Sequence, residues 1–127
     1  MYFLSAVAVG VGAALGALLR WWLGALLNPM FPTIPMGTLA ANWIGGFIMG
    51  IAMGFIANYQ ALSPELRLFV TTGFLGGLTT FSTFSGETVT LFLREQYGWA
   101  FGAIVLHVVG SLAMTLLGIY SFKLVRL

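Results

Sequence analysis

Residues 73–86 read Gly-Phe-Leu-Gly-Gly-Leu-Thr-Thr-Phe-Ser-Thr-Phe-Ser-Gly, within an apolar stretch, 67–93, that is long enough to cross a membrane. We do not expect this segment to form an undisturbed helix. Gly76 and Gly77 remove side chains in the middle of the stretch, and the hydroxyl groups that follow can replace backbone hydrogen bonds. A broken span presents helix ends and free carbonyl groups where ions can use them. The alternative is a kinked packing helix whose hydroxyls bond to their own backbone.

The composition of the chain predicts the rest of the fold class. Hydrophobic residues make up 60% of the 127 residues and charged residues 6%, whereas a typical soluble domain is about 25% charged. This balance excludes an ordinary soluble fold. The long neutral gaps between charges predict an all-α membrane protein that forms a single domain over residues 1–127 with four spans. We expect the spans at about 3–27, 37–58, 67–93 and 98–122.

The composition also limits the classes of function. The net charge of +2 is not concentrated in a basic patch, so we expect no nucleic-acid binding. The absence of cysteine excludes disulfides, thiol nucleophiles and thiolate metal sites. The N-terminus lacks the charged region and cleavage site of a signal peptide, so the first span is expected to stay in the mature protein.

Local signals mark helix starts and packing faces. Ser63-Pro64-Glu65 is expected to begin the third span as an N-cap, a first-turn proline and an acid that favours the helix dipole. Glycines at every fourth residue predict close helix packing. They are Gly12 and Gly16 in the first span and Gly46, Gly50 and Gly54 in the second. Spacing does not say whether these contacts lie within one subunit or between two.

Polar residues are distributed unevenly over the four spans. If the chain reverses at each connection, Arg20, Asn42 and Glu87 fall in the half of the bilayer opposite the termini, together with Thr38, and His107 falls near the midplane. One copy would then supply about half of a polar path across the membrane, and an oppositely inserted copy would supply the rest. We therefore hypothesise an antiparallel homodimer. Positive charge is nearly balanced between the two faces, as dual insertion requires.

Three polar residues within the spans each have more than one interpretation. Arg20 can pair with Glu87 or reach the membrane surface, and it can also make an anion-attracting vestibule. Asn42 can bond a neighbouring helix or contact an ion. A lone histidine is more often satisfied by a neighbour than used as a ligand, so we assign no proton relay or metal to His107.

The hydroxyls and phenylalanines of the broken stretch favour an anion. Phe81 and Phe84 lie on one helical face, and the positive edge of an aromatic ring can meet an anion without trapping it by a full charge. Hydroxyl hydrogens suit an anion and free carbonyl oxygens suit a hard cation, so the break can present both. Fluoride would need many such donors to replace its water. Spacing alone does not name fluoride.

The chain resembles the Fluc (CrcB) family of fluoride channels along all four spans. The matching segments are Gly16-Ala-Leu-Leu-Arg20-Trp21, Gly37-Thr-Leu-Ala-Ala-Asn42 with Gly45, Gly73 through Ser85 with Glu87, and Gly110-Ser111-Leu112. The run from Gly76 to Ser85 is highly specific, whereas glycine spacings occur in many membrane proteins. The resemblance implies a fluoride-selective channel for passive efflux, not an enzyme. It also implies the plasma membrane of a prokaryote, which is the inner membrane in a Gram-negative cell.

The same resemblance implies an assembly and a resident ion. It implies a dual-topology antiparallel homodimer with two fluoride pores. A structural sodium ion would be held at the centre of the dimer by the backbone oxygens of Gly76 and Thr79 from each subunit.

Roles for individual side chains also follow from the resemblance. Phe81 and Phe84 would be the ring pair that faces fluoride. Asn42 would sit at the vestibule end of the pore, and Arg20 would bear on the vestibule charge. The hydroxyls expected in the pathway are those of Ser82, Thr83 and Thr115, which form a track, and that of Ser111. No catalytic residue is implied.

Two other classes of function remain open from the residues themselves. A proton-coupled fluoride or small-ion transporter would normally use a titratable residue in its pathway, and only Glu87 and His107 qualify. A non-transporting scaffold would use the polar cluster only to fix packing. A small multidrug exporter, another compact four-span class, would be expected to carry an acid in the first span, and none lies there.

Overall fold

The computed structural model describes residues 2–126, which are mostly helical and include no β-strand. In chain order the elements are α1 (Tyr2–Leu27), the 3-10 turn η1 (Asn28–Met30), α2 (Met36–Asn58), α3 (Pro64–Leu68), the π-helical segment η2 (Phe69–Leu75), α4 (Gly76–Leu78), α5 (Phe81–Leu93) and α6 (Tyr97–Arg126). The predicted all-α class is confirmed. The helical segments long and apolar enough to cross a membrane are Tyr2–Met30, Met36–Asn58 and Tyr97–Arg126.

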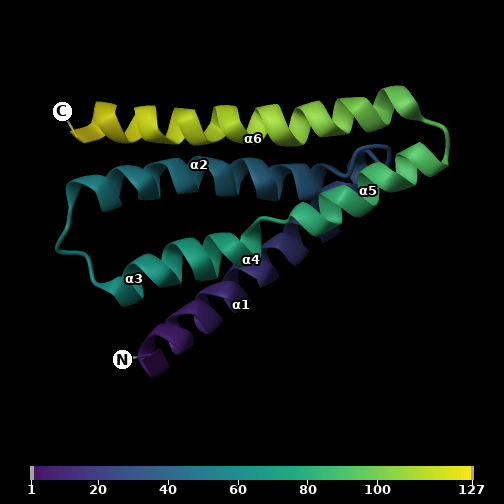
Figure 1. Ribbon diagram of the computed structural model, residues 1–127. Coiled ribbons are helices and arrows are strands. Elements are labelled where there is room, and N and C mark those ends of the chain that lie inside the picture. The colour runs from purple at the N-terminus through teal and green to yellow at the C-terminus, as the bar shows by residue number, and fades with distance from the viewer. Residues whose placement is uncertain (1, 127) are drawn as a thin grey trace.

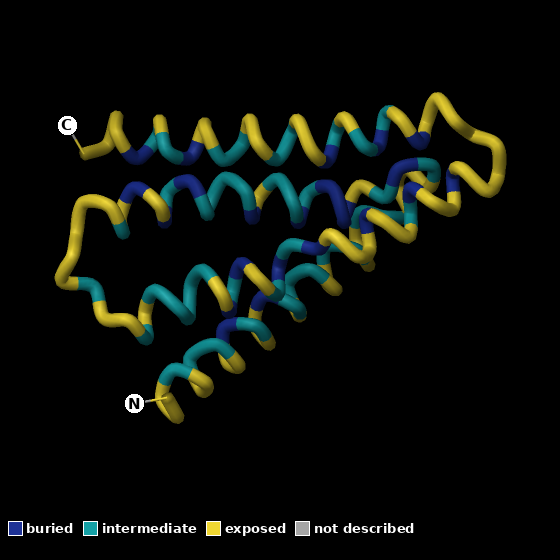
Figure 2. The backbone as a smooth tube through the Cα atoms, viewed as in Figure 1, coloured by how far each residue is buried: buried dark blue, intermediate teal, exposed yellow. Residues whose placement is uncertain are grey.

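The helices pack in two groups, and the group that contains α1 runs obliquely to the group of α2 and α6 (Figure 1). Helices α2 and α6 run side by side, while α1 packs along η2 and α4 (Figure 1). Helix α5 continues beyond α4 toward the start of α6, and both ends of the chain lie at the same end of the bundle (Figure 1). Buried positions face neighbouring helices, and exposed positions lie mainly on outward sides (Figure 2). Those outward sides carry large apolar residues such as Leu18, Val109 and Leu116, which suits contact with lipid.

Glycine allows close backbone contact within one subunit. A Cβ atom added at Gly12 would overlap the backbone of η2, and one added at Gly77 would overlap the carbonyl oxygen of Ala13 on α1. In the other group, a Cβ atom at Gly50 would overlap the carbonyl oxygen of Thr115 on α6. The prediction that the glycine spacing marks packing faces is confirmed, and these contacts lie between helices of the same chain.

Side chains satisfy the first amides of α3 and α2. Ser63 Oγ accepts a hydrogen bond from the Leu66 amide at 3.1 Å, so the predicted N-cap is confirmed. Asn28 Oδ1 accepts from the amides of Gly37 at 2.7 Å and Thr38 at 3.3 Å. Asn28 therefore satisfies two of the amides that the start of α2 leaves without a helical partner, and it ties the first connection to that helix.

The helical path of residues 64–93 is interrupted between α4 and α5. Helices α3, η2 and α4 follow one another directly, whereas Thr79 (φ −83°, ψ 155°) and Thr80 (φ −148°, ψ 118°) have extended backbones. Helix α5 then begins at Phe81, and Thr80 Oγ1 caps it by accepting from the Thr83 amide at 3.0 Å. The two extended residues lie beside α2, and they shape the site described next.

Candidate ion pathway

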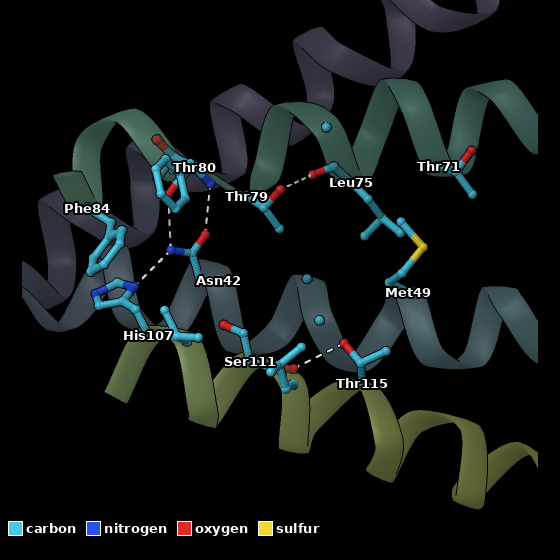
Figure 3. Close-up of a pocket in the computed structure, with 16 residues that line it drawn as sticks. Asn42, Met49, Thr71, Leu75, Thr79, Thr80, Phe84, His107, Ser111 and Thr115 are labelled. Carbon is cyan, nitrogen blue, oxygen red and sulfur yellow. Dashed lines mark hydrogen bonds between the residues drawn. The ribbon is translucent and has the colours of Figure 1, made fainter. Parts of the chain in front are cut away.

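A groove runs between α2, α6 and the residues around the interruption (Figure 3). Its volume is about 450 Å³ and its lining is mostly apolar. The polar side chains that line it are those of Asn42, Thr71, Thr79, Thr80, His107, Ser111 and Thr115. The larger apolar side chains that line it include Met49, Leu75, Phe81 and Phe84. A concave apolar surface with a few converging polar groups is the usual form of a site for a small ligand.

Asn42 bonds the interrupted backbone twice. Its Oδ1 accepts from the Thr80 amide at 2.8 Å, and its Nδ2 donates to the Thr80 carbonyl oxygen at 3.1 Å. Asn42 Nδ2 also lies 2.9 Å from Nδ1 of His107 (Figure 3). Since a carboxamide carries two N–H hydrogens, both are engaged inside the protein. From the sequence, Asn42 could bond a neighbouring helix or contact an ion. In the structure its side chain bonds the neighbouring backbone at Thr80.

Two backbone carbonyls near the interruption lose their regular helical partners. In a continuous helix the Thr80 amide would bond the Gly76 carbonyl, but it bonds Asn42 instead. The Thr83 amide would likewise bond the Thr79 carbonyl, but it bonds Thr80 Oγ1. Carbonyl oxygens of this kind are suitable ligands for a hard cation. The donor set at Gly76 and Thr79 therefore fits the sodium ion that the family resemblance implies.

The two phenylalanines predicted to face an anion are neighbours in space. Their ring centroids are 5.4 Å apart, and the planes meet edge to face at 72°. Phe84 is buried, with 7% of its surface exposed, and its ring lies 4.5 Å from the ring of His107 at an angle of 32°. Phe81 is 76% exposed and projects from the subunit. One ring is thus held inside the chain and the other is left open on its surface.

The predicted hydroxyls divide into two sets. Ser111 and Thr115 line the groove, whereas Ser82 and Thr83 are exposed on α5 outside it. Thr79 and Thr115 each donate to the carbonyl four residues earlier, at 2.8 Å and 3.0 Å. The hydroxyl groups of these two threonines therefore bond to the backbone of their own helical segment.

Arg20 and Glu87 have separate partners. Arg20 Nε donates to the Gly77 carbonyl at 3.0 Å and so fastens α1 to α4. Thr38 Oγ1 donates to Glu87 Oε2 at 2.6 Å, which joins α2 to α5. The pairing of Arg20 with Glu87 that the sequence allowed is not the arrangement formed. Glu87 instead borders a second hollow of about 580 Å³, which Arg94 also lines.

Similarity to known proteins decides the family. A family model described as "CrcB-like protein, Camphor Resistance (CrcB)" matches residues 7–119. The chain belongs to the CrcB family. The family resemblance predicted from the sequence is thereby confirmed, and the segments on which it was based lie inside the matched range.

The CrcB relatives share most of their length with this chain. A protein from Nitrosospira multiformis is 62% identical over 116 residues, which cover 91% of each chain, and its name is "Fluoride-specific ion channel FluC". Proteins with the same name from Pseudomonas syringae pv. maculicola and Chromobacterium violaceum are 56% and 55% identical, over 95% and 96% of this chain. They cover 95% and 97% of those relatives. With its long apolar helices, the chain is a multi-pass membrane protein.

Two residues of the CrcB site were not assigned roles from the sequence. The Thr80 backbone bonds Asn42, and the Thr80 side chain caps α5. His107 Nδ1 lies within hydrogen-bond distance of Asn42 Nδ2 and accepts from its second N–H group. A threonine directly before a new helix was a usable signal for the cap. No signal in the sequence joined Asn42 to Thr80 or His107, because those pairs are distant along the chain.

Proposed function

We propose that this CrcB chain is a fluoride-selective ion channel that gives passive efflux of fluoride and lowers fluoride in the cytoplasm. The observation that carries the proposal is 62% identity to a relative named as a fluoride-specific channel. The geometry supports it, because an edge-to-face ring pair borders a groove that also holds hydroxyl groups. The process is movement of an ion, so no side chain is assigned a catalytic role. The plasma membrane of a prokaryote is the proposed location.

Passage through such a channel depends on many weak donors. The positive edges of Phe81 and Phe84 replace part of the water around fluoride without holding it by a full charge, which allows release. Ser111 and Thr115 lie along the groove, and the exposed hydroxyls of Ser82 and Thr83 extend the track over α5. These four hydroxyls are proposed to accompany the ion along its path.

Asn42 and Arg20 serve the pathway less directly. Because both N–H groups of Asn42 are engaged, its proposed contribution is to hold the Thr80 backbone beside the vestibule end of the pore. Arg20 is the single cation of α1, and its charge is proposed to make the vestibule attractive to anions. Its bond to Gly77 keeps that charge at a fixed position.

Residues 64–93 are proposed to form the third of four membrane crossings, broken at Thr79 and Thr80. Two copies are proposed to assemble as an antiparallel homodimer with two pores. The exposed ring of Phe81 supports this, since a second copy would cover an aromatic group that one subunit leaves open. Gly10 and Gly86 also have open space where a side chain would lie, which leaves room for a neighbouring helix.

Dual insertion predicts that C-termini are present on both sides of the membrane. The chain has no cysteine, so one cysteine appended to the C-terminus would be its single thiol. In sealed vesicles, a membrane-impermeant maleimide should label about half of the copies from outside, and the rest only after the vesicles are opened. Labelling from one side alone would rule out the antiparallel arrangement.

A sodium ion is proposed at the centre of the dimer. The backbone carbonyls of Gly76 and Thr79 from each copy would hold it, as their lost helical partners allow. When bound, the ion would supply a fixed positive charge where the two copies meet.

The alternative function is a proton-coupled fluoride or small-ion transporter, which Glu87 or His107 would have to serve. A fluoride electrode separates the two functions in liposomes that hold purified protein, fluoride and an imposed proton gradient. A channel should release fluoride rapidly down its own gradient and should not concentrate it when only a proton gradient is present. Uphill fluoride movement driven by protons would instead establish the transporter.

A further inference from the structure

The bonds around Asn42 determine the form of His107. The Thr80 amide needs an acceptor and the Thr80 carbonyl needs a donor, so the Asn42 carboxamide can satisfy both in one orientation only. In that orientation the second N–H of Asn42 points at His107 Nδ1, 2.9 Å away. Nδ1 must therefore accept, and a neutral imidazole that accepts at Nδ1 carries its hydrogen on Nε2.

The His107 ring also supports one of the two phenylalanines. It lies 4.5 Å from the ring of Phe84 at 32°, and only 4% of the residue is exposed. The His107 imidazole thus contacts both Asn42, which bonds the interrupted backbone, and the buried ring of Phe84. A change at His107 would reach both features at once.

The charged groups on the neighbouring helices are already engaged. Helix α2 carries no charged residue, and His107 is the sole titratable group of α6 between Gly98 and Ile119. On α5 the nearest charged residue along the chain is Glu87, which accepts from Thr38. On α1 the single cation, Arg20, donates to the Gly77 carbonyl. In the part of the chain that the structure describes, the printed contacts of His107 are with Asn42 and Phe84, and neither carries a charge.

We propose that His107 is a positioning residue that supports ion passage in its neutral Nε2–H form. Uptake of a proton at Nδ1 then lowers the rate of ion passage. An Nδ1–H group would face an N–H of Asn42, and the carboxamide would have to turn round to accept from it. That turn would place a donor against the Thr80 amide and an acceptor against the Thr80 carbonyl, so both bonds that hold the interruption would be lost. The inference rests on the proposed function and adds its regulation by acid.

A charged imidazole would hinder passage in a second way. It would put a full positive charge against Phe84, in a site where fluoride is proposed to be met by weak ring edges. Conduction requires an ion to leave as readily as it enters, and a full charge in a mostly apolar groove would hold fluoride back. Both effects lower the rate of passage as the pH falls.

The first test uses the fact that the chain contains one histidine. In wild-type protein with ¹⁵N-labelled histidine in liposomes, the single imidazole should give the nitrogen shifts of the Nε2–H form at about pH 7.5. Its Nδ1 should be the nitrogen that takes up a proton on acidification. An Nδ1–H form at that pH would overturn the inference without reference to transport.

The second test compares the pH dependence of fluoride efflux in wild type and in His107→Gln. Glutamine can accept from Asn42 but has no proton to gain in this range, so the variant is expected to conduct somewhat more slowly than wild type. From about pH 7.5 to about pH 5.5, wild-type efflux should fall at least about fivefold and the variant's by less than about twofold. Protein-free liposomes at each pH measure the leak of neutral hydrogen fluoride, and size-exclusion chromatography checks assembly.

The outcomes separate the inference from the proposed function. Parallel pH profiles in two conducting proteins would overturn the role of His107 and leave the channel function standing. Absence of protein-dependent fluoride movement in wild type at every pH would overturn the channel function and this regulation with it.

Discussion

Substitution of Asn42 by aspartate is expected to reduce fluoride efflux at least about fiftyfold. A carboxylate has no N–H, so the Thr80 carbonyl and His107 Nδ1 would both lose their donor. The added negative charge would also repel fluoride, by about 4 kcal/mol at 4 Å under the effective screening of a protein surface, where about 1.4 kcal/mol corresponds to a factor of ten. The measurement is initial efflux from liposomes followed with a fluoride electrode.

Asn58→Asp is the matched control for this substitution. Asn58 lies at the other end of α2, where its side chain bonds the Gly54 carbonyl and Arg126, and it does not line the groove. The same change of amide to carboxylate should leave efflux within about twofold of wild type, because the new charge lies at the end of the helix and is screened by solvent. Wild-type efflux in Asn42→Asp would contradict the role assigned to Asn42.

Substitution of Phe81 and Phe84 together by isoleucine is expected to lower fluoride efflux about 10- to 100-fold while the protein still assembles. Isoleucine keeps an apolar side chain but has no positive ring edge. An aromatic pair contributes about 0.5–1.5 kcal/mol beyond its buried area, and with the same magnitude for the contact of each ring edge with the ion, the loss of two corresponds to about 1–3 kcal/mol in its passage. Efflux per assembled protein should be compared after size-exclusion chromatography.

Phe101→Ile is the control for loss of a ring. Phe101 is exposed on the outward side of α6 and lines neither hollow described above, so its replacement should not change efflux. Unchanged efflux in the double phenylalanine variant would remove the rings from the mechanism. The scaffold interpretation would then regain support.

The helix class and several local features could be predicted because they depend on short-range chemistry. Charge-free gaps of membrane length predicted helices, Ser63 beside Pro64 predicted a cap, and glycine spacing predicted close packing. In each case the deciding residues are neighbours along the chain or lie on one helical face. The sequence did not say which glycine contacts lie inside one subunit, because that requires the positions of other helices.

The reason given for a disturbance in the third stretch was partly wrong. Gly76 and Gly77 are helical in α4, and the role of Gly77 is to let α1 approach at Ala13. The extended residues are Thr79 and Thr80, where the backbone amide of Thr80 turns to Asn42 rather than to Gly76. A contact between positions 38 residues apart decides this geometry, and no local propensity encodes it.

The sequence and the family resemblance named candidate residues for the site, but not how their side chains are arranged. Family resemblance brought Asn42, Phe84 and Thr115 into the predicted pathway, and these side chains line one groove. The resemblance did not indicate that His107 accepts a hydrogen bond from the second N–H group of Asn42. Hydrogen-bond partners depend on the rotation of side chains about helices, and hydrophobic periodicity does not carry that information.

The most direct test of the central claim is a paired measurement of fluoride and chloride efflux from liposomes that contain the purified protein, with potassium permeability supplied by an ionophore. A fluoride-selective channel should release fluoride within seconds, while chloride in matched liposomes should leave no faster than it does from protein-free ones. Equal release of both anions, or fluoride release no faster than in the absence of protein, would contradict the account.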